Sequence, residues 1–440
     1  MSPTDGSSPM TFNLFVIALD DFNLETMRGL RETRRYEFHS LLPMGDVLKA
    51  DGYDYEELLA AADQELKAFD GPVHGIATWW DFPSSGLAPV LSERWDLYGP
   101  SLRSVVVLEH KYWSRLAQRA VAGEHVPAFA AFDPFDDDAL EQIEKRGVTY
   151  PFWLKPIKSV GSYLGFRIDS VDDWEPAIAT MREEIGQFGD PFDQALSRVE
   201  MPPDVEAVGG SGCLAEGIIG GRQCTLEGYV SHGEAHVYGT VDSLRMPGVS
   251  TFRSYQYPSQ LPVPIQRRME QIAIDVVKQA GLDHCCFNAE FFYDEAEGKI
   301  WILEVNTRLS QSHCDLFAKV DGASSQRAML ALSQGRTPRM LHRQGEFAVA
   351  GKFFLRTFED GVVGSAPSED DIRRVVERFP GTRVEIDATA GRRLSDMAVQ
   401  ETYSYELGRV FIGADDHDQL EERFSAIEAM LPFDIKTEGA

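Results

Sequence analysis

The chain has 440 residues, and its 42 Lys and Arg against 70 Asp and Glu give a formal net charge of −28. This length predicts about two to four domains, since one domain usually takes roughly 100–200 residues. A hydrophobic content of 43% is ordinary for a folded globular protein and excludes a disordered one. The negative charge argues against nucleic acid and against a membrane surface as partners, because both are anionic.

The sequence shows neither a membrane span nor a secretory signal. No stretch approaches the roughly 18 apolar residues of a span, and MSPTDGSSPM at the start lacks a basic and an apolar signal region. The five cysteines are odd in number and form no CxxC pair; they are Cys213, Cys224, Cys285, Cys286 and Cys314. We therefore expect a cytoplasmic protein with free thiols, and we expect Cys285 and Cys286, which have no evident base, to pack rather than react.

The first part of the chain predicts a small α/β domain over residues 1–125. Residues 12–19 and 73–78 have the pattern of buried strands, and apolar residues at helical spacing predict a helix over 54–69 between them. Residues 101–121 fit two structures, since SVVVL favours a strand and KYWSRLAQRAV favours a helix.

The second part, residues 126–213, predicts three strands and one helix. The strands are expected in VPAFAAF, PFWLKPI and SYLGFRI, and a loop containing glycines separates the last two. A helix is expected over 171–185, because Ser170 is a suitable N-cap and acidic residues follow in the first turn. Residues 186–213 contain several Gly and Pro, so we expect them to be irregular.

The remaining chain predicts two further units, 214–340 and 341–440. The first begins with LAEGII, QCTLEGYV and EAHVYGTV, which predict a meander of three strands. An amphipathic helix over 263–281 and two strands over 284–294 and 299–306 follow. The C-terminal unit mixes strand patterns with a helix, so we expect a separate small α+β domain.

The most informative stretch is FNAEFFYDEAEGKIWILEVN, residues 287–306. Two runs of strand-forming residues flank DEAEGK, so the pattern predicts a β-hairpin. We place Glu290 opposite Glu304, which sets Asp294 opposite Ile300 at the turn. The core face then carries Ala289, Phe291 and Tyr293 opposite Trp301, Leu303 and Val305, and the polar face carries Asn288 and Glu290 opposite Glu304 and Asn306, with Phe292 facing Ile302.

This register brings two carboxylates together. Directly opposed side chains lie about 5 Å apart at Cβ, and like charges at that distance are destabilising. A divalent cation would turn the repulsion into attraction, and two carboxylates with an amide are oxygen ligands that suit magnesium or manganese. The alternative is that these residues are solvated on an exposed face of a sheet.

Five stretches in order resemble the ATP-grasp superfamily, and they cover about residues 105–335. They are LEHKYWSRL, PFWLKPIKSVGSYLG, LAEGIIGGRQCTLEGYV, NAEFFYD and EVNTRLSQS. The last is most similar to the carbamoyl-phosphate-synthetase, biotin-carboxylase and amino-acid-ligase branches. The resemblance implies an α/β (α+β) ATP-grasp fold: a Rossmann-like domain over 1–125, a lid subdomain over 126–213, a catalytic subdomain with the nucleotide- and metal-binding sheet over 214–340, and a small C-terminal domain over 341–440.

The resemblance implies a binding site for the phosphates of ATP. Lys111 in LEHKYWSRL and Lys155 in PFWLKPI would supply positive charge to the triphosphate. Gly161 and Ser162 lie in the phosphate loop, residues 159–165, whose backbone N–H groups can approach phosphate oxygens.

The resemblance also implies contacts with the nucleoside. Glu216 is expected beside the adenine, with backbone groups of Ile218 and Ile219 bonded to it. Many members have a glutamate for the ribose hydroxyls where this chain has Gln223, so Gln223 takes that assignment. For Glu227 two roles stay open, a contact near the nucleotide or second substrate and a cap on a sheet face.

The resemblance assigns the metal ligands and a catalytic arginine. Glu290, Glu304 and Asn306 would hold Mg²⁺ or Mn²⁺, and Arg308 would steady the γ-phosphate or an acyl phosphate through bidentate bonds. Lys155 is expected to act with Arg308 in catalysis. The sequence departs from the family at Thr307, where proline or glycine is usual.

The histidines give no sign of a site. His232, His236, His284 and His313 have no metal-binding spacing, so we expect them to be structural or solvated.

Taken together, the resemblance implies an ATP-dependent carboxylate–amine ligase. A small carboxylate and an amine, expected to be amino acids, would be joined through an acyl phosphate, with release of ADP and phosphate. Residues 150–213 would form a mobile lid that excludes water. The sequence leaves a homodimer open. It also leaves two alternatives open: a bicarbonate-activating enzyme of the biotin-carboxylase or carbamoyl-phosphate type, and a non-catalytic ATP-binding regulatory protein.

Overall fold

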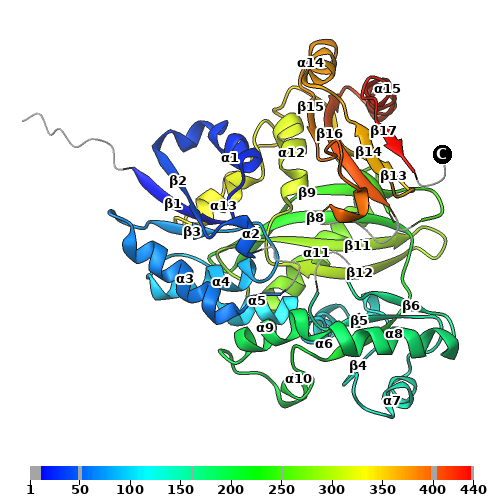
Figure 1. Cartoon of the computed structure of the whole chain (residues 1–440). Helices are drawn as coiled ribbons and strands as arrows, with labels where there is room; N and C mark the ends of the chain where they lie inside the picture. Colours follow the sequence, from blue (N-terminus) through cyan, green and yellow to red (C-terminus); the bar gives the residue numbers. More distant parts are fainter. Residues whose placement is uncertain (1–10, 48–51, 160–162, 250, 398–403, 438–440) are drawn as a thin grey trace, which may run out of the picture.

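The computed structural model describes residues 11–47, 52–159, 163–249, 251–397 and 404–437. Within these ranges the strands form sheets of three, four, eight and two strands. Figure 1 shows the N-terminal unit on the left, the four-stranded sheet with its helices at the bottom, and the C-terminal strands and helices at the upper right, with the other strands of the eight-stranded sheet between them. The mixed α/β fold class is confirmed.

The N-terminal unit is a parallel sheet with helices around it. Its strand order is β2-β1-β3, and β1 pairs in parallel with both neighbours. The helix predicted over 54–69 is confirmed as α3, which starts where the Asp54 side chain accepts a hydrogen bond from the N–H of Glu57. The elements are β1 (Phe12–Ile17), α1 (Asp21–Arg28), η1 (Arg31–Arg35), β2 (Tyr36–Leu41), α2 (Met44–Val47), α3 (Tyr55–Ala68), β3 (Gly75–Ala77) and α4 (Ser84–Arg94).

The ambiguous stretch 101–121 is helical throughout. It forms α5 (Leu102–Glu109) and α6 (Lys111–Ala122), followed by η2 (Gly123–His125). The Ser101 side chain caps α5, and His110 Nδ1 accepts from the N–H of Trp113 at the start of α6. The valine run is buried inside the fold, and this burial outweighs its preference for a strand.

The four-stranded sheet has the order β4-β7-β5-β6 and is antiparallel throughout. The predicted strand LAEGII is its member β7, so its expected place in a meander with the next two strands is wrong. The reason is non-local: β7 is buried between β4 and β5, which come from far upstream. The strands are β4 (Phe129–Phe132), β5 (Phe152–Pro156), β6 (Phe166–Ile168) and β7 (Cys213–Gly217).

The helices of this region include three that were not expected, α7, α9 and α10. Helix α8 is confirmed, with a capping box between Ser170 and Asp173. Residues 186–213 are not irregular, because α9 and α10 lie within them. Buried Phe192 and Leu196, one helical turn apart, anchor α9 despite its Gly and Pro. The helices are α7 (Ala139–Lys145), α8 (Val171–Glu184), α9 (Gly186–Leu196) and α10 (Pro203–Glu206).

The eight-stranded sheet has the order β12-β11-β8-β9-β10-β13-β16-β15. Strands from the last hundred residues continue this sheet, since β13 pairs with β10 (Figure 1). The proposed domain boundaries stay a prediction. The strands are β8 (Arg222–Ser231), β9 (Glu234–Arg245), β10 (Phe252–Tyr257), β11 (Cys285–Asp294), β12 (Lys299–Asn306), β13 (Val349–Thr357), β15 (Arg383–Ile386) and β16 (Tyr405–Ala414).

The other elements surround this sheet. The predicted helix over 263–281 is confirmed as α11, and β14 pairs with β17 in the two-stranded sheet. These elements are α11 (Val263–Gln279), η3 (Gln311–His313), α12 (Cys314–Asp321), α13 (Gln326–Leu332), β14 (Val362–Ser365), α14 (Glu369–Arg378), η4 (Leu394–Asp396), α15 (His417–Glu428) and β17 (Asp434–Lys436).

The hairpin of β11 and β12 has the predicted register at its polar end only. Glu290 faces Glu304, but a bulge follows, and Phe291 pairs with Ile302 while Asp294 faces Lys299 rather than Ile300. Leu303 is the additional residue of the bulge. Beyond it, Ile300 and Ile302 point into the core, so the expected core positions of Trp301 and Leu303 and the pairing of Phe292 with Ile302 are wrong.

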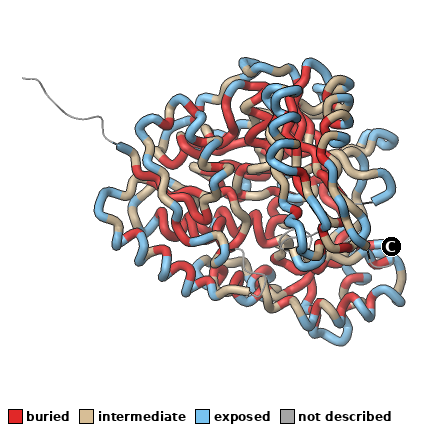
Figure 2. The backbone as a smooth tube through the Cα atoms, turned by 45° about the horizontal axis from the view of Figure 1, so that its top comes forward, coloured by how far each residue is buried: buried red, intermediate tan, exposed pale blue. Residues whose placement is uncertain are grey.

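Buried positions run through the centre of the molecule, along the sheets and the inner faces of the helices (Figure 2). All five cysteines are buried and free, as expected of packing residues. In the described ranges no helix is both long and apolar enough to cross a membrane.

Candidate active site

The opposed carboxylates on β11 and β12 form an electrostatically strained pair. Glu290 is half-buried, and burial together with the charge of Glu304 raises the pKa of Glu290 to about 8. Gln223 Nε2 donates to Glu290 Oε2 at 2.9 Å, and Asn306 Nδ2 donates to Glu304 Oε1 at 3.3 Å. Among the described residues, no three His, Cys, Asp or Glu side chains form a metal site. Two carboxylates and an amide do not fill the octahedral shell that magnesium takes, so an ion held by them would have positions for further oxygen ligands.

Three lysines lie near this pair: Lys111, Lys155 and Lys158. Lys111 begins α6, and its Nζ donates to Ser159 Oγ at 3.2 Å. Burial and the charge of nearby Lys158 lower the pKa of Lys111 to about 8, and both Lys155 and Glu304 are close enough to influence it. The structure thus brings both predicted phosphate-binding lysines near the acidic pair.

Lys155 on β5 is held by a buried carboxylate. It forms an ion pair with Glu216 on β7, whose other oxygen accepts from Arg115 Nε at 2.9 Å. Although burial opposes its charge, Arg115 and Lys155 lower the pKa of Glu216 to about 2. Both oxygens of Glu216 are therefore engaged by cations, and the predicted contact of Glu216 with adenine stays a prediction.

The other residues predicted to contact the nucleotide differ in burial. Ile218 and Ile219 follow β7 outside any strand or helix and are half-buried. Gln223 is buried, and its Oε1 accepts from Arg245 Nη2 at 2.6 Å, so its amide bridges this cation to the acidic pair. Its ribose contact stays a prediction. Gly161 and Ser162 lie outside the described residues.

Lys158, which the sequence did not single out, follows β5 and is connected through Glu109 of α5 to Thr307, which follows β12. Its side chain is 6% exposed, and its Nζ donates to Glu109 Oε2 at 2.7 Å. Thr307 Oγ1 donates to the other oxygen of Glu109 at 3.0 Å. The departure from the family at Thr307 therefore supplies a hydroxyl for this network. The only local feature of the sequence that could have indicated Lys158 is the clustering of lysines in LKPIK.

Arg308 faces a carboxylate from the N-terminal unit. Its Nε and Nη2 donate to Asp81 Oδ1 and Oδ2 at 2.9 and 3.0 Å, and this pair keeps the pKa of Asp81 below its usual range despite burial. Asp81 follows β3, and ligand crevices in parallel sheets form beyond the carboxyl ends of their strands. That position was the only sequence signal for Asp81.

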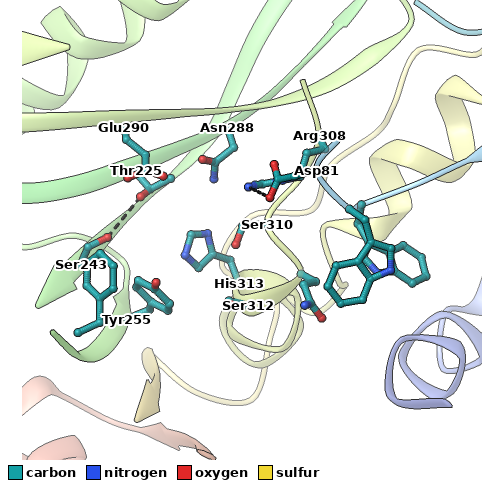
Figure 3. Close-up of a pocket in the computed structure, with 14 residues that line it drawn as sticks. Asp81, Thr225, Ser243, Tyr255, Asn288, Glu290, Arg308, Ser310, Ser312 and His313 are labelled. Carbon is teal, nitrogen blue, oxygen red and sulfur yellow. Dashed lines mark hydrogen bonds and ion pairs between the residues drawn. The ribbon is translucent and has the colours of Figure 1, made fainter. Parts of the chain in front are cut away.

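A cavity of about 220 Å³ lies between these elements (Figure 3). Glu290 and Arg308 both line it, so one carboxylate of the acidic pair and the guanidinium border the same space. Its wall combines aromatic and polar side chains; the other lining residues are Trp79, Trp80, Asp81, Thr225, Ser243, Phe252, Tyr255, Asn288, Ser310, Gln311, Ser312 and His313.

Glu227 organises one wall of this cavity. It is fully buried, and the choice between its two predicted roles stays open. Its carboxylate accepts from Asn288 Nδ2 at 2.7 Å, from the Ser310 N–H at 3.2 Å and from His313 Nδ1 at 2.8 Å. His313 is only 2% exposed, so of the two expected alternatives, structural or solvated, it is not the solvated one.

The sequence matches one family model, described as an ATP-grasp domain, over residues 148–315. No curated protein sequence matches the chain.

The fold is similar to solved structures across nearly the whole chain. An L-amino acid ligase from Bacillus licheniformis has a TM-score of 0.71 at 16% identity, covering 98% of this chain and 100% of the other. The biotin carboxylase domain of 2-oxoglutarate carboxylase from Hydrogenobacter thermophilus, with MgADP and bicarbonate, has 0.64 at 16%, covering 98% and 92%. N5-carboxyaminoimidazole synthetase from Staphylococcus aureus, with ADP, has 0.63 at 13%, covering 95% and 98%.

Proposed function

From the ATP-grasp domain that this chain carries, we propose that it is an ATP-dependent carboxylate–amine ligase. A carboxylate oxygen of the first substrate attacks the γ-phosphorus of ATP, and the bond from that phosphorus to the ADP oxygen breaks. The amine of the second substrate then attacks the carbonyl carbon of the acyl phosphate. Its C–O bond breaks, inorganic phosphate leaves, and an amide is formed.

The observation that carries this proposal is the cavity, which is lined by Glu290 and Arg308 together. Bicarbonate is a small and fully polar ion, whereas this cavity has aromatic walls that include Trp79, Trp80 and Tyr255. Aromatic walls with a few convergent polar groups are typical of sites for organic ligands. The cavity therefore favours an organic acid over bicarbonate as the activated substrate.

The charges in the cavity support amino acids as substrates. Arg308 is a bidentate donor that matches a carboxylate or an acyl phosphate, and Asp81 beside it is a counter-charge for an ammonium group. One cavity that contains both signs of charge suits a zwitterion. Similarity in fold to an L-amino acid ligase agrees with this choice.

The acidic pair fits Mg²⁺, with Mn²⁺ as an equivalent. Glu290, Glu304 and Asn306 offer only oxygen ligands, and burial together with the charge of Glu304 raises the pKa of Glu290, so a cation bound between the two carboxylates would be favourable. When bound, the ion would neutralise charge that develops on the phosphate oxygens.

The chain's own residues position the nucleotide and the reacting groups. Lys111 and Lys155 supply positive charge for the triphosphate, and Glu216 holds Lys155 in place. Arg308 steadies the acyl phosphate at the mouth of the cavity. The four-stranded sheet and its helices act as a lid that keeps water from the intermediate.

A screen for ADP release tests the proposal. The protein is given MgATP with amino acids and small carboxylates, alone and in pairs, and products are identified by mass spectrometry. ADP, phosphate and an amide mass from one pair are the expected result. Phosphate release that needs bicarbonate but no amine would establish the bicarbonate-activating alternative. Binding of ATP without ADP release from any pair would establish the regulatory one.

A further inference from the structure

His313 is a buried histidine on the cavity wall whose ring is fixed from two sides. Glu227 Oε1 accepts from Nδ1 at 2.8 Å, and the Tyr255 ring meets the imidazole edge-on with centroids 5.0 Å apart. Figure 3 shows the imidazole projecting from the turn that carries Ser310 and Ser312 into the space lined by Asn288 and Tyr255.

The contact with Glu227 decides which ring nitrogen is basic. A carboxylate only accepts hydrogen bonds, so Nδ1 carries the proton, and Nε2 of the neutral ring has the lone pair. Nε2 has no hydrogen-bond partner in the part of the chain that the structure describes. It is also not among the enclosed polar atoms without a partner, so it is open to the cavity.

The other groups near the cavity have different partners. Asp81 is paired with Arg308, and Glu290 faces Glu304. The two other fully buried histidines of the described ranges bind backbone carbonyls, His110 to Gly209 and His125 to Ile300. On the described cavity wall, His313 is the histidine that presents a basic nitrogen to a ligand.

We propose that His313 is the general base that deprotonates the incoming amine, an inference that rests on the proposed function. At neutral pH an aliphatic amine is an ammonium ion and has no lone pair for attack. One N–H proton passes to His313 Nε2, and the released lone pair forms the bond to the carbonyl carbon of the acyl phosphate. The C–O bond to phosphate breaks, and the second amine proton ends on the departing phosphate.

Glu227 is a positioning residue in this step. It holds Nδ1–H, keeps the lone pair on Nε2, and stabilises the imidazolium that forms when Nε2 takes the proton. Its two other donors, Asn288 and the Ser310 N–H, fix the carboxylate itself. The ring is therefore held in one tautomer and one orientation before the amine arrives.

Hydroxylamine distinguishes the formation of the acyl phosphate from the deprotonation of the amine. Hydroxylamine is mostly unprotonated at neutral pH, so it traps an acyl phosphate as a hydroxamate without needing a base. The amine substrate needs one. His313→Gln should therefore form hydroxamate from MgATP and the carboxylate substrate within about twofold of the wild-type rate. We expect amide formation to fall about 100-fold or more, the usual contribution of a general base.

The matched control is His236→Gln, which changes an exposed histidine on β9 outside the cavity lining and should leave both products unchanged. Amide formation by His313→Gln at the wild-type rate overturns the inference. So does an equal loss of both products in a variant that melts like the wild type. If His313→Gln does not fold, His313→Asn is subjected to the same two assays. A wild-type protein that forms no hydroxamate with any carboxylate overturns the proposed function itself, which is a distinct outcome.

Discussion

Removing one charge of the acidic pair should stabilise the protein and abolish its reaction. Glu304→Gln leaves the shape of the hairpin but ends the repulsion across β11 and β12. Two charges about 5 Å apart interact by about 3 kcal/mol at an effective dielectric constant of about 20. The exposure of Glu304 lowers this to about 1–2 kcal/mol. Without divalent ions we therefore expect the free energy of unfolding to rise by about that amount at pH 9.

The pH dependence has a definite sign. The pKa of Glu290 in the folded protein, about 8, lies above its ordinary value of 4.5, so the folded state binds the proton more tightly. Wild-type stability in EDTA should therefore decline as the pH rises toward and through 8, and Glu304→Gln should weaken this decline.

The assay is urea unfolding followed by tryptophan fluorescence in EDTA, and again with MgADP. MgADP should stabilise the wild type but not Glu304→Gln, and ligation should be lost in that variant. Glu297→Gln removes the same charge from the exposed turn of the hairpin and serves as the control. Stabilisation of Glu304→Gln by MgADP to the wild-type extent would refute the metal assignment. If Glu304→Gln is less stable than the wild type in EDTA, the proposed repulsion between Glu290 and Glu304 is wrong.

Two further substitutions test the neighbouring groups. Arg308→Lys keeps the charge but loses the two parallel hydrogen bonds that Arg308 now donates to Asp81. Steady-state ADP release should therefore fall about 10- to 100-fold, with nucleotide affinity nearly unchanged. Unchanged turnover would contradict the role of Arg308 at the acyl phosphate. Glu216→Gln leaves Arg115 and Lys155 without their shared carboxylate and should lower the free energy of unfolding by about 3 kcal/mol, measured in urea; a change under about 1 kcal/mol would contradict it.

The features that could be predicted from the sequence are those that depend on neighbouring residues. Alternation and a short turn fixed the register that places Glu290 opposite Glu304, and an N-cap with an acidic first turn fixed the start of α8. The bulge at Leu303 could not be read in the same way. Ile300, Trp301 and Ile302 before it are all apolar, so an additional apolar residue there leaves no mark on the alternation.

The features that could not be predicted depend on pairings across long distances in the chain. The Arg308–Asp81 pair joins residues 227 positions apart, and His313 meets Glu227 from 86 positions away. No periodicity within a segment reports such a pairing. For the same reason β7 was assigned to the wrong sheet, because a strand pattern does not identify its partners. The cavity and its base therefore became visible only in the fold.

At the junction between the four-stranded sheet and the eight-stranded sheet, a chain of contacts positions Lys155 relative to β12. Arg115 on α6 binds Glu216 of β7. Its Nη1 also donates to the carbonyl of Ile302 on β12, at 2.9 Å. Glu216 in turn holds Lys155. Two ion pairs, Lys155–Glu216 and Glu216–Arg115, and the hydrogen bond from Arg115 to Ile302 thus connect Lys155 to the strand that carries Glu304. Because β5 and β7 are paired in one sheet, Lys155 and its anchor Glu216 are held together, and Arg115 connects that anchor to β12.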